Sequence, residues 1–577
     1  MSWEIKSALK EVVSRETGAQ IFSPGTRHNM GFLYPNTYNI GMSNLGLQIL
    51  YGEINGRGDT ACERFFYPHK SKIKDYVRTN THLLSMENQR PLNEFEVIGV
   101  MMSFEMDYLN FLTMLELGKV VRLAAERKEK DPFVIMGGPC ATFNPEPLAL
   151  FTDAFVIGEG EETLQLLLDA LYAAKAQGLS RQEILRKLAQ IPGVYVPCFY
   201  QPQYGAEGNF TGMQCSIGVP ATIKRQWVKE LDRHVGHSAI ISAETEFENM
   251  YIVEVARGCG RHCRFCMAGY CFRKPRARSL EAVMEAIHKR PATTKKVGLM
   301  GAAISDYPEI KALTKMLVAE NIPFTVASLR ADSLDQELAA ALALSGQRTM
   351  TVAPEAGSER MRQFINKGIT EADIYRAVAL AAQAGMKNIK LYYMIGLPEE
   401  AEQDITEMIA MIERVRGKMD AAGNRGDLII SINGFVPKPF TPFQWSPMLD
   451  VKTLKQRFSR ITEAFRKNMR IKIQTESPKE AALQTVLARG DRKIGLVLQQ
   501  ALTQHDGNLK MAFKNLHLDV EAQATKAFDL DEALPWGHLD MGLQADYLRT
   551  ELANAYQQKF TIPCFEHCKR CGICNEE

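Results

Sequence analysis

The sequence predicts an α/β protein in which a Rossmann-like N-terminal domain precedes a partial TIM (β/α)6 barrel and a mostly helical C-terminal region. Short apolar strands alternate with helix-length amphipathic segments in two separate stretches, and the alternation ends near residue 450. The 577 residues are also too many for one ordinary domain. The predicted domains are residues 1–178, a linker with a small β element at 179–248, the barrel at 249–450 and the helical region at 451–577.

The first stretch predicts a parallel sheet with helices on both faces, because its strands are apolar throughout and are separated by helical segments. Ligands of such sheets lie beyond the carboxyl ends of the strands. Four glycines follow two of these strands, and they either let a bulky ligand approach the backbone or form simple tight turns. The strands are NMGFLYP, FEVIGVMMS, FVIMGGP and DAFVIGEGEE, and the glycines are Gly137, Gly138, Gly158 and Gly160.

The second stretch predicts the barrel, because six strands follow one another with a helix-length segment after each. In barrels of this type the chemistry takes place at the carboxyl ends of the strands. The first strand is followed at once by RGCGRHCRFCMAGYC, residues 257–271. The six strands are YIVEVA, KVGLMG, FTVASL, MTVAP, IKLYYMIG and LIISING.

Composition and charge narrow the classes of function. No signal peptide and no membrane-length apolar run is visible, so we expect a cytoplasmic protein without a membrane partner. A net charge of +2 does not favour general nucleic-acid binding. One basic stretch, FRKPRARS at 272–279, is either a solvated loop or a contact for a phosphate or carboxylate. Clustered cysteines in a reducing compartment indicate metal binding or redox chemistry and not disulfides.

Cys259, Cys263 and Cys266 have the spacing C-x3-C-x2-C and offer three thiolates from one loop. A structural zinc ion takes four ligands, and Cys271 or His262 is available as the fourth. A [4Fe–4S] cluster with three cysteine ligands instead leaves one iron open to a substrate or cofactor. The spacing favours the iron–sulfur interpretation, in which Cys271 is a buried apolar residue.

With Phe265 before the third cysteine, this loop resembles that of the radical S-adenosylmethionine (radical SAM) enzymes. The resemblance implies a partial barrel whose open iron chelates the amino and carboxylate groups of S-adenosylmethionine. An electron from the cluster then cleaves the sulfonium bond and yields methionine and a 5′-deoxyadenosyl radical. It also implies an electron donor such as flavodoxin or ferredoxin.

The same resemblance implies cofactor contacts at later strand ends. Strand three ends in SLRAD and strand four in APEAGSERMRQFINKG, which is similar to radical methylthiotransferases, and MIGLPEE is similar to the glycine turn under the adenine. After strand two the family commonly has Gly-Gly-Glu, whereas this chain has GAAISDYP, so Ser305 and Asp306 are the candidate substitutes. The implied binding residues are Ser328, Arg330, Glu355, Gly396 and Leu397.

The N-terminal domain resembles the cobalamin-binding domain of cobalamin-dependent radical SAM enzymes. The cobalt-ligating motif Asp-x-His-x-x-Gly is absent. Many members of the class lack that motif and leave the lower face of cobalt without a protein histidine, so the resemblance still implies cobalamin. The stretches GMSNLGLQILY, GGPCATFNPEPLALF and LPWGHLD, with the closing cysteines, resemble one uncharacterised subgroup of this class.

A second cysteine group follows in TIPCFEHCKRCGICNEE. Its tight spacing favours a second iron–sulfur cluster over a zinc site, which remains the alternative. Because the protein supplies all four ligands, we expect this cluster to relay electrons or stabilise structure, not to bind substrate. The ligands are Cys564, Cys568, Cys571 and Cys574.

The leading functional hypothesis is an enzyme that cleaves S-adenosylmethionine reductively and uses the radical, with cobalamin, on an unactivated carbon of an unknown substrate. The nearest alternative is a methyl- or methylthio-transferase that modifies RNA or protein, suggested by the fourth strand and the basic stretch. A third hypothesis is a non-catalytic scaffold in which both cysteine groups hold zinc.

Overall fold

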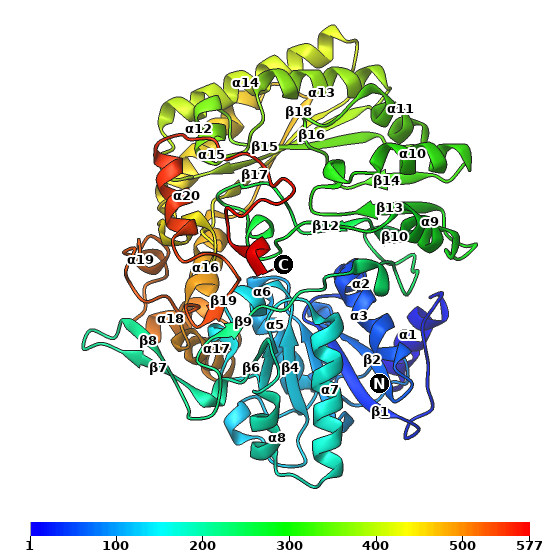
Figure 1. Ribbon diagram of the computed structural model, residues 1–577, viewed down its shortest axis with the longest axis vertical. Coiled ribbons are helices and arrows are strands. Elements are labelled where there is room, and N and C mark those ends of the chain that lie inside the picture. The colour runs from blue at the N-terminus through cyan, green and yellow to red at the C-terminus, as the bar shows by residue number, and fades with distance from the viewer. Residues whose placement is uncertain (1, 577) are drawn as a thin grey trace.

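One six-stranded sheet forms the N-terminal half of the computed structural model, which describes residues 2–576 (Figure 1). Five strands run parallel and the sixth pairs antiparallel at one edge. Every residue of β2 and β3 is buried, as expected where helices cover both faces. The spatial order is β2 (Thr60–Phe66), β1 (His28–Tyr34), β3 (Val97–Met101), β4 (Phe133–Gly137), β5 (Ala154–Val156) and β6 (Val194–Tyr195).

All four strands predicted in this half are present, as β1, β3, β4 and β5. Strand β2 was not predicted, because Glu63 and Arg64 interrupt its apolar run. Both side chains are nevertheless buried. The guanidinium of Arg64 is compensated by Glu16 at 2.7 Å and Glu87 at 2.6 Å, as a buried charge requires.

The strand order places a topological switch between β1 and β3, because the chain moves outward in opposite directions on either side of it. The carboxyl ends of β1, β3, β4 and β5 therefore meet at one edge of the sheet, where ligands of such folds bind. The main covering helices are α3 (Leu45–Gly56), α5 (Tyr108–Leu117) and α7 (Gly160–Ala176).

The segment between the two halves contains local structure and a long-range strand pair. It begins with α8 (Arg181–Leu188) and includes the hairpin of β7 (Tyr200–Tyr204) and β8 (Phe210–Cys215). Strand β9 (Ile223–Lys224) then pairs with β19 (Leu539–Asp540), more than 300 residues later. This segment is thereby tied to the C-terminal region.

Seven parallel strands form the second half, and helices follow them around its outside (Figure 1). The six predicted strands are all present, and β18 adds a seventh beyond residue 450. A single bridge, Leu329 to Val352, joins the first three strands to the last four. The strands are β10 (Met250–Glu254), β13 (Lys296–Met300), β14 (Phe324–Val326), β15 (Thr349–Glu355), β16 (Asn388–Ile395), β17 (Leu428–Gly434) and β18 (Ile471–Thr475).

The inner surface of this partial barrel is less tightly filled than the N-terminal sheet. Along β15 and β16, buried residues alternate strictly with half-buried ones. Successive side chains of a strand point to opposite faces, so one face packs against helices while the other faces a more open interior. The covering helices are α9 (Leu280–His288), α10 (Ile310–Ala319), α11 (Gln336–Leu344), α13 (Glu371–Gln383), α14 (Glu402–Ala421) and α15 (Val451–Phe465).

After β18 the chain is mostly helical, as predicted. It crosses back to the N-terminal half, where α17 packs on α5, and then returns to the barrel, where α20 packs on α12 (Figure 1). Among residues 2–576, no helix has the combination of length and apolar character needed to cross a membrane. The helices are α16 (Pro478–Arg489), α17 (Lys493–Gln504), α18 (Leu509–Asn515), α19 (Val520–Ala524) and α20 (Tyr547–Tyr556), and α12 spans Glu359–Phe364.

Candidate active site

The loop with the first three cysteines leaves the barrel directly after β10. Its base is closed by antiparallel pairing of β11 (Ala256–Arg257) with β12 (Arg276–Ala277). At this base Gly258 has a φ of +78°, and a Cβ there would lie 2.1 Å from the carbonyl oxygen of Phe272. No other residue fits such a position. The loop is therefore fixed at the carboxyl end of the first strand, where barrel enzymes carry their chemistry.

Cys259, Cys263 and Cys266 lie near one another in buried surroundings. Within residues 2–576, no three His, Cys, Asp or Glu side chains converge on a single metal position. Burial raises the pKa of the Cys259 thiol, and burial together with the neighbouring Cys263 raises that of Cys266 to about 12. Binding of a metal centre deprotonates such thiols. The donor set fits an iron–sulfur cluster, whose irons take thiolate ligands.

The far side of the loop is anchored to the end of α12. The backbone N–H of Arg264 donates to the carbonyl of Ile365 at 3.0 Å, and its Nη1 donates to the carbonyl of Phe364 at 2.8 Å. Phe265 packs against an apolar cluster that includes Ala356 and Leu397. The aromatic residue of the motif thus contacts the segments after β15 and β16.

Glu355 ends β15 at a shift in strand pairing and has a φ of +67°. Its carboxylate accepts a hydrogen bond from Lys367 Nζ at 3.2 Å. Burial lowers the pKa of Lys367, but the Glu355 carboxylate and nearby Cys263 outweigh burial and raise it. A buried cation therefore lies between Glu355 and the cysteine loop. Lys367 is part of the FINKG motif, but the sequence pattern alone does not distinguish it as a site residue.

Two further predicted residues lie on the segment after β14. Arg330 is paired with Asp332 by hydrogen bonds of 3.0 and 2.8 Å and donates to the carbonyl of Lys367 at 3.2 Å. The guanidinium thus supports the Lys367 backbone. Ser328 is exposed on the same segment.

Ser305 and Asp306, the candidate substitutes for the family's acidic residue after β13, differ in whether they already have hydrogen-bond partners. Asp306 accepts two hydrogen bonds from Arg261, at 2.9 and 2.7 Å. The Oγ of Ser305 is shielded from solvent and has no hydrogen-bond partner among the described residues. A buried hydroxyl without a partner costs free energy, so Ser305 keeps hydrogen-bonding capacity for a ligand.

Gly396 forms a turn at the end of β16 with a φ of +86°. Its N–H donates to the Glu400 carboxylate at 2.7 Å, and Glu400 accepts from Arg457 Nη1 at 2.8 Å. Burial raises the pKa of Glu400 to about 7. Leu397 is buried beside this turn. Glu400 was present in the quoted MIGLPEE, but its holding role depends on a partner 57 residues away.

The second cysteine group lies against the first. The N–H of Cys564 donates to the carbonyl of Gly260 at 2.8 Å, and its sulfur lies 3.9 Å from His262 Nε2. Asn366 adds a bridge, donating to the carbonyls of His262 at 3.1 Å and Thr561 at 2.9 Å. No local sequence pattern indicates contacts between segments about 300 residues apart.

Apolar packing also holds the tail against the barrel. Cys571 is buried in an apolar cluster with Tyr270, Trp445 and Tyr547. Tyr270 belongs to the cysteine loop, whereas Trp445 follows β17. The tail therefore connects the beginning of the barrel to a segment near its end.

The three arginines of the basic stretch at 272–279 are buried and do not form a solvated loop. Arg273, Arg276 and Arg278 are 1%, 7% and 4% exposed. Arg276 pairs with Glu159 of the N-terminal half at 2.6 Å, and Arg278 pairs with Glu254 at 2.9 Å. The stretch instead joins the two halves through the buried ion pair of Arg276 with Glu159.

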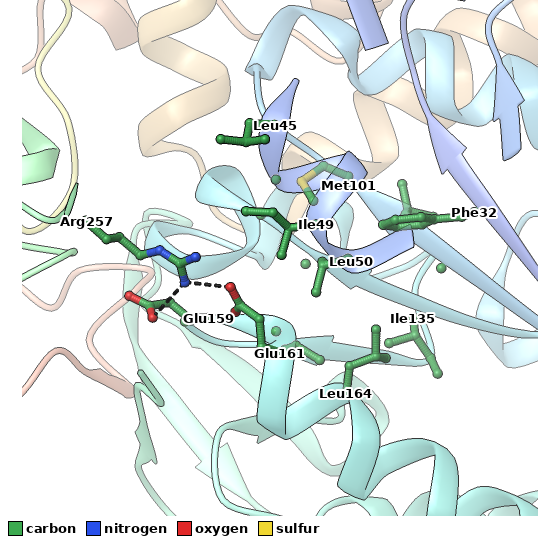
Figure 2. Close-up of a pocket in the computed structure, with 18 of the residues that line it drawn as sticks. Phe32, Leu45, Ile49, Leu50, Met101, Ile135, Glu159, Glu161, Leu164 and Arg257 are labelled. Carbon is green, nitrogen blue, oxygen red and sulfur yellow. Dashed lines mark hydrogen bonds and ion pairs between the residues drawn. The ribbon is translucent and has the colours of Figure 1, made fainter. Parts of the chain in front are cut away.

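Arg257 extends this network at the mouth of a cavity, as Figure 2 shows. It contacts Glu159 at 3.0 Å, Glu161 at 2.6 Å and Glu254 at 2.8 Å. Although burial raises the pKa of Glu159, Arg276 and Arg257 hold it below its usual value. The Glu159 carboxylate is therefore ionised at neutral pH, between the guanidinium groups of Arg257 and Arg276.

The cavity itself holds about 270 Å³ and lies at the carboxyl edge of the N-terminal sheet, between α3 and α7 (Figure 2). Its walls are mainly apolar side chains, among them Phe32, Ile49 and Leu164. The structure places Gly137, Gly138, Gly158 and Gly160, the four glycines of the sequence analysis, in its lining. Gly138 and Gly158 have positive φ and closely approach Met102 and Gln226, so these two are required by the backbone itself.

The loop after β1 carries Asn36-Thr37-Tyr38-Asn39-Ile40-Gly41, which has the spacing of Asp-x-His-x-x-Gly with tyrosine at the histidine position. The Tyr38 hydroxyl donates to Glu16 at 2.6 Å. Glu16 also binds Arg64, so Tyr38 is held by the protein itself. No histidine occupies this loop.

Comparison with protein families decides the class of the chain. Residues 46–197 match the model described as radical SAM proteins, N-terminal, and residues 253–412 match that of the radical SAM superfamily. The chain is a radical SAM protein. A member of this family is an enzyme that uses S-adenosylmethionine and a [4Fe–4S] cluster. The hypothesis of a non-catalytic zinc scaffold is therefore wrong.

Several relatives are similar to this chain over different lengths. An uncharacterized protein of Methanocaldococcus jannaschii is 28% identical over 82% of this chain and 90% of its own length. An uncharacterized methyltransferase of Pyrococcus horikoshii is 24% identical over 50% of this chain and 60% of its own length. A tRNA-2-methylthio-N(6)-dimethylallyladenosine synthase of Chlorobium phaeobacteroides is 23% identical over 28% of this chain and 39% of its own.

Among solved structures, this chain is similar to that of the radical S-adenosylmethionine methyltransferase TsrM from Kitasatospora setae, which was solved with cobalamin and a [4Fe–4S] cluster bound. The TM-score is 0.46 at 15% identity, over 73% of this chain and 77% of that chain. The cobalamin-dependent radical enzyme OxsB with S-adenosylmethionine bound also has a TM-score of 0.46 at 15% identity, over 67% of this chain and 52% of that one.

Proposed function

We propose that Cys259, Cys263 and Cys266 hold the [4Fe–4S] cluster of this radical SAM enzyme. The observation that carries the proposal is the placement of three thiols on one glycine-anchored loop after the first barrel strand. When bound, the cluster supplies the electron that cleaves S-adenosylmethionine to methionine and a 5′-deoxyadenosyl radical. With three protein thiolates, one iron stays open to the amino and carboxylate groups of S-adenosylmethionine.

The remaining contacts of S-adenosylmethionine are assigned to neighbouring strand ends. The unpartnered Ser305 hydroxyl is suited to the amino group. Glu355, beside the buried Lys367, is suited to the ribose hydroxyls, because a carboxylate strengthens the hydrogen bonds it accepts. The turn at Gly396 and Leu397 lies under the adenine, and Glu400 holds that turn. Ser328 and Arg330 complete the set, with Arg330 acting through the Lys367 backbone.

Cobalamin is the proposed second cofactor, bound at the carboxyl edge of the N-terminal sheet. The 270 Å³ cavity takes only part of so large a molecule, and its apolar walls suit an aromatic group. The rest of the molecule would lie outside the cavity, on the barrel side. Since Tyr38 is held by Glu16, no side chain at the motif position is free to ligate cobalt. Retention of hydroxocobalamin through gel filtration tests this assignment, and loss of the cobalamin with the iron–sulfur centre intact contradicts it.

The second cysteine group is proposed to hold another iron–sulfur cluster, with Cys564, Cys568, Cys571 and Cys574 as ligands. Four thiols within eleven residues suit ferredoxin-type ligation. Contact between Cys564 and the first loop supports a relay of electrons from a flavodoxin- or ferredoxin-type donor. Iron and acid-labile sulfide measured after anaerobic purification separate this cluster from a zinc site.

The substrate is proposed to present an unactivated carbon, on which the radical acts with cobalamin. A methyl- or methylthio-transferase for RNA or protein is the second candidate, favoured by the relatives whose names include tRNA methylthio synthases. Anaerobic reconstitution and reduction in the presence of S-adenosylmethionine, followed by metabolite analysis, tests the first activity. Transfer of isotope from methyl-labelled S-adenosylmethionine to tRNA, to protein or to a metabolite separates the candidates.

A further inference from the structure

One buried arginine in the loop between β11 and β12 has no carboxylate partner. Arg273 is 1% exposed. Its Nε and Nη2 donate to the carbonyls of Gly269 and Arg261, at 2.6 and 2.9 Å. Its Nη1 lies 3.2 Å from both ring nitrogens of His262. Among residues 2–576, no carboxylate lies within ion-pair distance of this guanidinium. Buried charges in proteins are normally paired, because an isolated one is costly to desolvate.

Other buried arginines close to Arg273 in the chain are compensated. Arg264, Arg276 and Arg278 each have a carboxylate partner within 3.4 Å. Arg225, which donates to the carbonyl of Arg273, also has no such partner in the described part of the chain, and burial lowers its pKa to about 10. A buried guanidinium in this region therefore has either a carboxylate partner or a lowered pKa.

Arg273 fits neither description, because it faces the thiols of the C-terminal tail. His262 connects it to Cys564, whose sulfur lies 3.9 Å from His262 Nε2. The Arg273 guanidinium also lies 5.7 Å from the centre of the Tyr270 ring, which packs in one apolar cluster with Cys571. Although burial lowers the pKa of Arg273, nearby groups led by Cys564 and including Cys571 outweigh burial and raise it.

The other cations beside the tail do not have this position. Lys569 is exposed and Arg570 is half-buried, so water screens both charges. Arg264 is buried but is already paired with Glu551. Four thiolates around a zinc ion or an iron–sulfur core leave a net negative charge. A tail that has bound its metal therefore supplies the opposite charge that Arg273 lacks.

We propose that Arg273 is the counter-charge of the metal-loaded tail and the positioning residue that couples the two cysteine groups. Its guanidinium holds the cysteine loop through the carbonyls of Gly269 and Arg261, while thiolates of the tail compensate its charge. Metal binding by the tail stabilises the loop, and the loop strengthens metal binding by the same factor, because coupling between two sites is reciprocal. This inference rests on the proposed function, because it requires a metal centre in the tail.

The test uses the full-length chain with Cys259→Ala/Cys263→Ala/Cys266→Ala as the background, so that bound metal belongs to the tail. Co²⁺ is the probe, because its absorbance with thiolate ligands gives the dissociation constant directly. Arg273→Gln removes the charge. Arg273→Lys keeps the charge but lacks the planar fork that holds two carbonyls.

Arg261→Gln is the matched control. It removes one positive charge from the same loop, but the side chain of Arg261 pairs with Asp306 at 2.7 Å and has its own carboxylate. Melting midpoints of each protein are also measured with and without Co²⁺. This comparison separates compensation of the charge from simple support of the loop.

We expect Arg273→Gln to weaken Co²⁺ binding about tenfold, equivalent to about 1.4 kcal/mol, a typical coupling between two sites. Arg273→Lys should keep most of the affinity, and Arg261→Gln should match the background. Arg273→Gln should also lower the melting midpoint more with Co²⁺ than without it, because only the loaded tail compensates the charge. A residue that merely holds the loop carbonyls would lower both midpoints equally.

Equal Co²⁺ affinities of Arg273→Gln and the background would overturn the coupling and leave the tail as a metal site. The same conclusion follows if Arg273→Lys binds as weakly as Arg273→Gln, or if Arg273→Gln fails to fold even without Co²⁺. No Co²⁺ binding by the background, with no iron in the tail of the wild type, would instead contradict the proposed tail centre. Cleavage of S-adenosylmethionine by the wild type tests the barrel cluster separately.

Discussion

The barrel loop and the tail present the same chemical group in different settings. The loop places three thiols beside a buried lysine and an unpartnered serine hydroxyl, so polar groups remain for a ligand. The tail carries four thiols, of which Cys571 is packed among aromatic residues and Cys568 is also buried. By their spacing, both groups are candidate metal ligands. Their surroundings suggest that one centre binds a cofactor and that the other does not.

The largest expected effect follows from removing one loop thiol. Cys263→Ala should abolish formation of 5′-deoxyadenosine and lower bound iron by about four atoms per chain, the content of one [4Fe–4S] centre. Cys271→Ala is the matched control, because Cys271 is buried nearby but lies outside the three-cysteine motif. Product chromatography and iron analysis check both variants. Cleavage that persists in Cys263→Ala, or is lost in Cys271→Ala, would show that the ligand assignment is wrong.

Substitution and deletion of the tail should have different results. Cys568→Ala/Cys571→Ala should remove about four iron atoms and leave cleavage of S-adenosylmethionine with a strong chemical reductant. Truncation after Phe560 should impair cleavage as well, because it deletes the bonds of Thr561 to Asn366 and of Cys564 to Gly260. Iron content and 5′-deoxyadenosine yield are the measurements. Equal yields from both proteins would mean that the tail does not support the loop.

A smaller effect is expected at the ribose position. Glu355→Gln keeps the shape of the side chain but removes its charge, so the dissociation constant of S-adenosylmethionine should rise about tenfold, the difference between a charged and a neutral hydrogen bond. Glu359→Gln, at an exposed position that begins the following helix, should leave the dissociation constant unchanged. Equilibrium dialysis with the reconstituted protein checks this. An unchanged constant in Glu355→Gln would leave Glu355 only as the partner of Lys367.

The smallest effect on binding is expected from Glu400→Gln, because glutamine still accepts the hydrogen bond of Gly396. The dissociation constant should rise less than about threefold, the range of one weakened neutral hydrogen bond. This variant also has a pH signature. A carboxyl whose folded pKa is raised to about 7 contributes its stability fully below its ordinary pKa and loses that contribution as pH rises through 7.

Glutamine does not ionise, so Glu400→Gln should gain thermal stability relative to the wild type between pH 5 and pH 8. The gain is measured as the difference between the melting midpoints of the variant and the wild type at pH 5 and at pH 8. Ionisable groups that the two proteins share contribute equally to both midpoints, so their effect cancels in this difference. A constant difference would mean that Arg457 keeps Glu400 ionised throughout. The stability of the barrel would then depend less on pH than the burial of the Glu400 carboxyl implies.

The alternation of strands and helices predicted both sheets, because buried parallel strands need apolar runs regardless of distant partners. It failed at β2, where Arg64 and Glu63 are buried in the middle of a strand and are compensated by residues elsewhere. The order of the motifs predicted that Glu355 and Gly396 lie at the ends of two barrel strands. The positions of Lys367 and Glu400 beside them depend on tertiary contacts, which the motifs do not show.

The basic stretch at 272–279 is a second place where the sequence alone could not predict burial, because the partners are distant in the chain. The sequence left a solvated loop open as an interpretation, whereas the burial of Arg276 depends on Glu159, 117 residues earlier, and that of Arg278 on Glu254.

The hydrogen bond between Cys564 and Gly260 has a consequence for synthesis. Its partners are about 300 residues apart in the chain. At about 5–20 residues per second, a ribosome produces the loop roughly 15 to 60 seconds before the tail. During that interval the barrel thiols exist without their C-terminal cover. An iron–sulfur cluster that entered the loop during this interval would do so before Cys564 is in place.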